Sequence, residues 1–144
     1  SFARKADEEG FPQIARLFRA ASHAETIHAH NHLKALEGIK STAENLQVAI
    51  EGENYEVASM YPDFIQDAEA EGAKKALRSF QWAMEVEKVH AELYSKALAA
   101  LEAHAAQAET DYYICPFCGY THEGPLDGKC PVCGAAGEKF ERIA

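Results

Sequence analysis

The sequence lacks long apolar runs, an excess of positive charge, and cysteine outside its last 30 residues. It has no run of about 18 apolar residues, so no membrane-spanning helix is predicted. Fourteen Lys and Arg residues against 23 Asp and Glu residues give a net charge of −9. This balance disfavours nucleic acid and anionic membrane surfaces as partners. The 144 residues, 47% of them hydrophobic, can bury one sizeable core and a small appendage.

The four cysteines form two Cys-x-x-Cys pairs, Cys115 with Cys118 and Cys130 with Cys133. This spacing is typical of a metal site rather than of a disulfide framework, and it suits a reducing compartment. We therefore expect a cytoplasmic protein. Both pairs read Cys-Pro-x-Cys-Gly, and the glycines allow backbone N–H groups to approach the sulfurs. A four-sulfur site suits iron or zinc, and a purely structural zinc ribbon is the simpler alternative.

Apolar residues that recur every three or four positions predict helices over 1–9, 12–36, 42–71 and 73–106. Pro62 should kink the third helix or loosen one of its turns. The chain is then predicted to consist of a helical domain, a short polar linker and a cysteine module, at residues 1–106, 107–112 and 113–144.

The helical part repeats itself with a shift of 62 residues. Glu25 and His28 of a first Glu-x-x-His motif recur as Glu87 and His90 of a second. Both motifs lie on apolar helix faces, where a carboxylate is costly unless a cation compensates its charge. One such motif is weak evidence, but two at matched points of a repeat indicate a shared site.

Two more carboxylates, Glu53 and Glu56, occupy core-facing positions of the helix between the two motifs. A di-iron site in a four-helix bundle takes a Glu from each of two helices and a Glu-x-x-His from each of the other two. The simpler alternative is that these acids and imidazoles pair with one another or with Arg16, Arg19 or Arg78.

The repeat also indicates that a helix is missing. The counterparts of Glu53 and Glu56 would fall before residue 1, so the first repeat lacks most of its opening helix. We expect truncation, cleavage or absent residues rather than helix exchange between whole chains, since every exchanged chain would carry its own copy.

The Glu-x-x-His motifs are joined by Met60-Tyr61-Pro62 and by the two Cys-Pro-x-Cys-Gly segments, here called knuckles. Together they make the chain resemble the rubrerythrin family over essentially all its 144 residues. The resemblance implies a mainly α fold, a ferritin-like four-helix bundle with a truncated first helix followed by a small rubredoxin-like domain. It implies a non-haem di-iron peroxidase that reduces hydrogen peroxide to water in oxidative stress protection. Electrons would come from NAD(P)H through a separate reductase and rubredoxin, and the protein would be a homodimer or a higher homo-oligomer.

The resemblance also implies residue roles. Glu25 and Glu87 would bridge the irons, while Glu53 and His90 would be terminal ligands of one iron. The other iron would exchange Glu56 for His28 as its redox state changes, and Tyr61 would hydrogen-bond near the site. The remaining iron would take the four thiolates, with zinc as a substitute: Cys115, Cys118, Cys130 and Cys133.

Two other functions stay open. One is a ferroxidase or iron-handling ferritin-like protein, and the other is a non-enzymatic electron carrier or zinc-binding module. Because the linker is short, the rubredoxin-like centre is expected to serve the di-iron site of the partner subunit.

Overall fold

The computed structural model describes residues 1–106 and 109–144, and its mainly helical architecture confirms the predicted fold class. The chain forms two compact units, residues 1–41 and 42–144, and each is described by itself. The predicted linker includes Gln107 and Ala108, which lie outside the described residues, and the predicted domain limits stay a prediction. None of the helices in the described ranges combines the length and apolar character that a membrane crossing requires.

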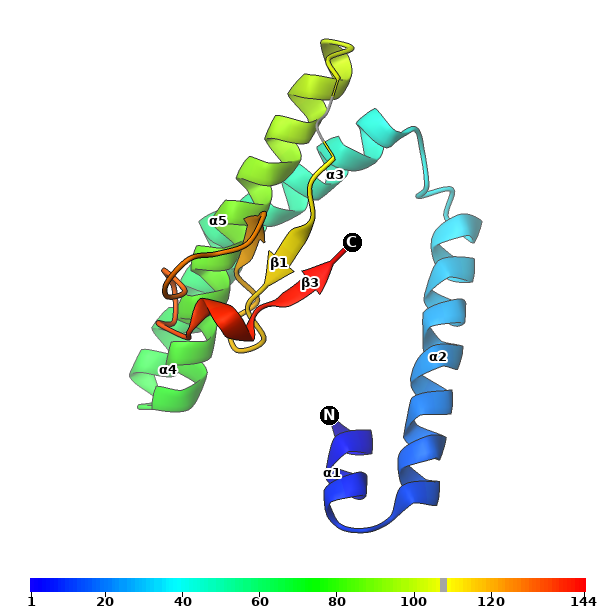
Figure 1. The fold of residues 1–144 in the computed structure, drawn as a ribbon, viewed down its shortest axis with the longest axis vertical. Helices are drawn as coiled ribbons and strands as arrows, with labels where there is room; N and C mark the ends of the chain where they lie inside the picture. The colour runs from blue at the N-terminus through cyan, green and yellow to red at the C-terminus, as the bar shows by residue number, and fades with distance from the viewer. Residues whose placement is uncertain (107–108) are drawn as a thin grey trace. The chain divides into compact units, whose positions relative to one another are not determined.

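The first unit is a helical hairpin of α1 (Phe2–Glu8) and α2 (Pro12–Ala35) (Figure 1). Gly10 adopts a φ of +80° between the helices, a conformation that costs glycine little, and Pro12 begins α2 where its missing N–H is harmless. The rings of Phe2 and Phe18 meet edge to face at 5.7 Å and hold the short helix against the long one.

The second unit contains the helices that carry most of the predicted site. A continuous helical segment runs through α3 (Thr42–Tyr55), a π-helical turn η1 (Glu56–Met60) and α4 (Tyr61–Ala70), and it packs along α5 (Lys74–Glu102). The predicted helix over 42–71 is therefore present, with the loosened turn ending at Met60, two residues before Pro62. A proline ring clashes with the carbonyl four residues earlier, and the wider π turn relieves that clash.

Packing between these helices is centred on aromatic rings and small residues. The rings of Tyr61, Phe64 and Phe80 lie 5.4–6.4 Å apart between α4 and α5. Ala68 of α4 is buried, with 5% of its surface exposed. These contacts fix α3 and α4 against one side of α5, which places carboxylates of α3 beside those of α5.

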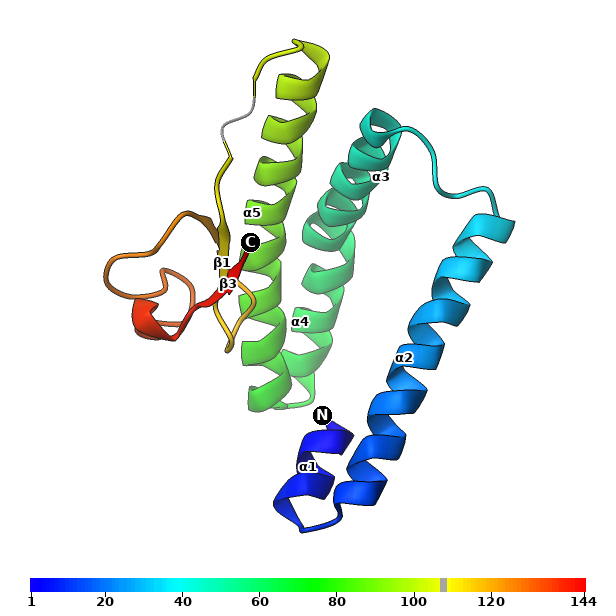
Figure 2. The ribbon, with the colours of Figure 1, turned by 45° about the vertical axis from the view of Figure 1, so that its right-hand side comes forward.

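The cysteine module is a small antiparallel sheet with strand order β2-β1-β3. Its strands are β1 (Tyr112–Ile114), β2 (Thr121–Glu123) and β3 (Glu141–Ile143), and a 3₁₀ turn η2 (Gly137–Lys139) precedes β3. Figure 2 shows the sheet and the α3–α4 segment on different sides of α5, and β2 contacts that helix. The module therefore packs on a helix of its own chain.

Candidate metal centres

The two cysteine knuckles of the module have the same backbone geometry. The N–H of Gly119 donates to the carbonyl of Cys115 at 2.9 Å, and the N–H of Cys115 donates to the carbonyl of Tyr120 at 2.9 Å. In the second knuckle, Gly134 and Cys130 make the corresponding pair of bonds. Gly119 and Gly134 have φ values of +85° and +76°, in the left-handed region that favours glycine. The Cys-Pro-x-Cys-Gly sequence thus folds each pair of thiols toward one point.

The four sulfurs form a cage of the size that a single metal ion requires. Cys115 Sγ lies 3.6 Å from Cys133 Sγ, and Cys118 Sγ lies 3.6 Å from Cys130 Sγ. All four sulfurs lie within 4.8 Å of one another. Metal–sulfur bonds of about 2.3 Å place tetrahedral ligands roughly 3.8 Å apart, whereas a disulfide needs about 2 Å. The four thiols are free, and their geometry fits an iron or zinc ion.

The thiols differ in how readily they lose a proton. Burial acts to raise the pKa of Cys115, but hydrogen bonds outweigh it and lower the pKa; the largest come from the backbone N–H groups of Phe117 and Cys118, and smaller ones from the thiols of Cys133 and Cys118. Burial raises the pKa of Cys118 and of Cys133. A bound cation would remove this cost, because it stabilises the thiolate form of every ligand.

A second donor group lies between α3 and α5. His90 Nδ1 is 2.7 Å from Glu87 Oε2 and 3.6 Å from Glu53 Oε1. These three donor atoms lie within 4.8 Å of one another. The two carboxylates are each 16% exposed and the imidazole 26%, so the group is partly withdrawn from water.

The electrostatics of this group also favour a cation. Burial, and next the neighbouring charge of Glu87, raise the pKa of Glu53 from 4.5 to about 7. The charge of Glu56 adds to the shift, and His90 opposes it. A metal ion that displaced the proton from Glu53 would offset the repulsion between the carboxylates.

Two residues that the family resemblance places near the irons, Glu56 and Tyr61, lie close enough to influence this group. Glu56 begins the π turn η1, and its charge reaches Glu53. Burial, and next the charges of Glu87, Glu56 and Glu53, raise the pKa of the Tyr61 phenol. Tyr61 therefore keeps its proton at neutral pH and can donate a hydrogen bond.

The remaining predicted ligands, Glu25 and His28, lie on α2 in the first unit. His28 Nδ1 is 3.2 Å from Glu25 Oε2, which repeats the contact of the second motif. Both side chains are exposed in that unit, at 76% for Glu25 and 59% for His28. The structure thus brings together Glu53, Glu87 and His90 in one unit and Glu25 with His28 in the other. The six-residue di-iron ligand set stays a prediction.

Two of the arginines considered as alternative partners interact elsewhere. Arg19 Nη1 donates to Asp7 Oδ2 at 2.8 Å, and the Arg78 guanidinium lies over the Trp82 ring at 5.1 Å. The donor set of two carboxylates and one imidazole fits iron, since carboxylate oxygens offset its charge and imidazole supplies nitrogen.

One contact of the group formed by Glu53, Glu87 and His90 was not predicted from the sequence. Thr121 of β2 places its hydroxyl oxygen 2.9 Å from His90 Nε2, across 31 positions of sequence. No local spacing could have indicated it, because it depends on how the module packs on α5.

Comparison with protein families assigns both parts of the chain. Residues 1–98 match the family model described as "Rubrerythrin", and residues 113–141 match the one described as "Rubrerythrin, rubredoxin-like domain".

Individual relatives agree with these matches. Rubrerythrin-2 of Clostridium acetobutylicum is 34% identical over an alignment that covers 97% of this chain and 84% of the relative. Nigerythrin of Nitratidesulfovibrio vulgaris is 38% identical, with 92% of this chain and 71% of the relative covered. The solved structure of fully reduced, all-ferrous nigerythrin is 36% identical and has a TM-score of 0.66, covering 99% of this chain and 76% of that one.

Proposed function

Because the chain belongs to the rubrerythrin family, we propose that it is a non-haem di-iron peroxidase that reduces hydrogen peroxide to water in oxidative stress protection. The family supports an oxidoreductase with a di-iron centre and a rubredoxin-like iron site. One observation carries the proposal. The carboxylate–histidine group and the sulfur cage lie in one compact unit, and the cage module packs on the helix that carries Glu87 and His90.

In this proposal the metal ligands come from the cysteine module and from the helices. The four cysteines hold one iron, and zinc is a substitute there. The two irons of the other centre are held by Glu25, His28, Glu53, Glu56, Glu87 and His90. Glu56 and His28 would be the residues that exchange at one iron, and Glu56 lies in the π turn η1, a kind of distortion often found at functional sites.

The residues around the centre manage protons. When bound, the two irons supply the two electrons that, with two protons, convert one peroxide into two waters. In this proposal Glu56 also takes up a proton as a general acid–base group. Tyr61, with its raised pKa, donates a hydrogen bond toward the same region. Partial burial limits water and strengthens these interactions.

The proposed reaction also needs a source of electrons. We propose that NAD(P)H supplies them through a separate reductase and rubredoxin, and that the protein acts in the cytoplasm as a homodimer or a higher homo-oligomer. Electron delivery to the partner subunit's di-iron site stays a prediction, whereas the contact of the cage module with α5 lies within one chain.

Stopped-flow mixing of the reduced, iron-loaded protein tests the reaction. The proposal expects peroxide to oxidise the iron faster than oxygen does. A faster reaction with oxygen would favour a ferroxidase, and particle size in solution would identify a storage cage. Zinc in both sites, or a metal-free bundle, would instead support a non-enzymatic carrier or zinc-binding module.

A further inference from the structure

The cysteine module contacts α5 through its first knuckle and through β2. On the module side they involve Gly119 in the turn of the first knuckle and two residues of β2, Thr121 and Glu123. The three contacts are Val86 with Gly119, His90 with Thr121, and Lys96 with Glu123.

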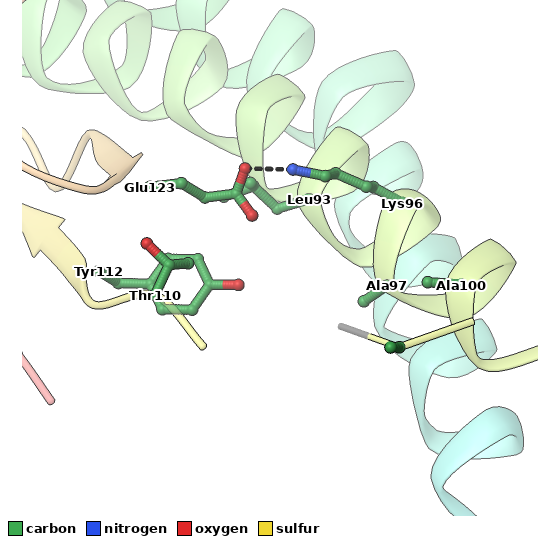
Figure 3. Close-up of a pocket in the computed structure, with 8 residues that line it drawn as sticks. Leu93, Lys96, Ala97, Ala100, Thr110, Tyr112 and Glu123 are labelled. Carbon is green, nitrogen blue, oxygen red and sulfur yellow. Dashed lines mark hydrogen bonds and ion pairs between the residues drawn. The ribbon is translucent and has the colours of Figure 1, made fainter. Parts of the chain in front are cut away.

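The Val86–Gly119 and Lys96–Glu123 contacts lie on either side of the contact between His90 and Thr121. A methyl group added at Gly119 would come 3.9 Å from Val86 Cγ1, so the first knuckle touches the buried part of α5. At the other end, Lys96 Nζ donates to Glu123 Oε2, and Figure 3 shows these side chains pointing toward each other beside a pocket of about 380 Å³. Thr121 is held between these two contacts.

The hydrogen bonds of Thr121 suit one tautomer of His90. The hydroxyl oxygen lies 2.9 Å from His90 Nε2 and 3.3 Å from the carbonyl oxygen of Gly119. When His90 Nδ1 binds a metal, Nε2 must carry the proton. Thr121 then accepts from Nε2–H, and its own hydrogen remains free to donate to Gly119. Every donor is satisfied in the ligating tautomer.

Without a metal, the 2.7 Å contact between Nδ1 and Glu87 Oε2 needs a shared proton, which the other tautomer supplies. Nδ1–H would donate to Glu87, and Nε2 would need the Thr121 hydrogen, which would leave the Gly119 carbonyl without this donor. Because Nδ1 also faces Glu53 at 3.6 Å, the ring orientation that Thr121 supports is the one that points Nδ1 at both carboxylates, where a metal ion would replace its proton.

We propose that Thr121 is a positioning residue for the carboxylate–histidine metal site, and that it makes docking of the cysteine module and metal binding by His90 favour each other within one chain. This inference rests on the part of the proposed function in which Glu53, Glu87 and His90 hold metal. Coupling of this kind is reciprocal, so docking of the module strengthens metal binding and a bound metal stabilises the docked module.

The test compares metal affinity in full-length variants whose sulfur cage already holds zinc. Thr121→Val removes the hydroxyl at nearly constant volume, Thr121→Ser keeps it, and Thr110→Val makes the same change at an exposed hydroxyl that bonds to Asp111. Co²⁺ is the probe, followed by calorimetry. Loss of a group that orients a ligand weakens metal binding by about tenfold or more. We expect that loss for T121V, and affinity within about twofold of the parent protein for T121S and T110V.

Two further measurements separate positioning from general damage. In the metal-loaded protein, the ¹⁵N and ¹H resonances of His90 Nε2–H should move in T121V and be restored in T121S. Amide hydrogen exchange in β2 should slow when Co²⁺ binds to the parent protein and change less in T121V. If T121V does not fold, Thr121→Ala removes the hydroxyl without a branched side chain and replaces it in the comparison.

The outcomes are distinct from those that test peroxidase activity. Equal Co²⁺ affinity in T121V and the parent protein, or equal losses in T121V and T121S, would overturn the positioning role while leaving peroxide chemistry unaffected. If T121V loses Co²⁺ affinity while T121S and T110V keep it, but the protein does not react with peroxide, the proposed function is wrong and the role of Thr121 stands.

Discussion

The raised pKa of Glu53 predicts that the metal-free protein loses stability as pH rises. A carboxyl group whose pKa is 4.5 in the unfolded chain and about 7 in the folded one binds its proton more tightly when folded. Its contribution is fully present below pH 4.5 and is lost as pH rises through about 7. A difference of this size corresponds to roughly 3 kcal/mol in the free energy of unfolding.

Replacing Glu53 by glutamine should remove this dependence. The carboxamide cannot ionise, so the stability of E53Q relative to the parent protein should improve by up to about 3 kcal/mol between pH 5 and pH 8. Glu51→Gln is the matched control, since Glu51 is an exposed carboxylate on the same helix that accepts from Gln47. Its stability relative to the parent protein should change by less than about 0.5 kcal/mol.

Urea unfolding of protein with zinc in the sulfur cage and no metal at the carboxylates measures the effect. Trp82, the single tryptophan of the chain, lies on α5 and reports the second unit by fluorescence. A change of about 3 kcal/mol shifts the urea midpoint by roughly 1–2 M. If the difference in unfolding free energy between E53Q and the parent protein is the same at pH 5 and pH 8, burial and Glu87 do not raise the pKa of Glu53, and the prediction is wrong. Co²⁺ binding should weaken in E53Q and stay unchanged in E51Q.

Three other changes test the remaining parts of the molecule. Cys115→Ser should lower the metal content of the sulfur cage while the helical circular dichroism stays near that of the parent protein; full metal retention would contradict the cage. Gly119→Ala should cost about 1 kcal/mol in thermal unfolding because its φ is +85°, whereas Gly52→Ala in α3, where an added Cβ meets nothing within 4 Å, should be neutral or stabilising. Glu56→Ala should slow the peroxide step in stopped flow without altering the sulfur-cage spectrum, and an altered spectrum would argue against separate roles for the two centres.

The helical organisation was predictable because it depends on local spacing. Apolar residues recurring every three or four positions predicted the long helices to within a few residues, since that spacing matches the turn of a helix. Pro62 predicted a loosened turn, and the structure forms it as the π turn at Glu56–Met60. The particular form of that turn was not predictable, because several local distortions relieve the same clash.

The sequence by itself determined the chemistry of this protein: which donor atoms it carries, their repetition at matched helical positions, and the knuckles that bring four sulfurs together. Spacing is enough for that, because backbone geometry fixes how residues three or four positions apart lie on one helix and how a glycine turn closes a pair of cysteines. The structure brings Glu53 to Glu87 and His90, as the family resemblance implied, and only the tertiary structure decided that Thr121 reaches His90 across 31 positions. Those contacts depend on the packing of α3 and β2 against α5, which many distant side chains decide together.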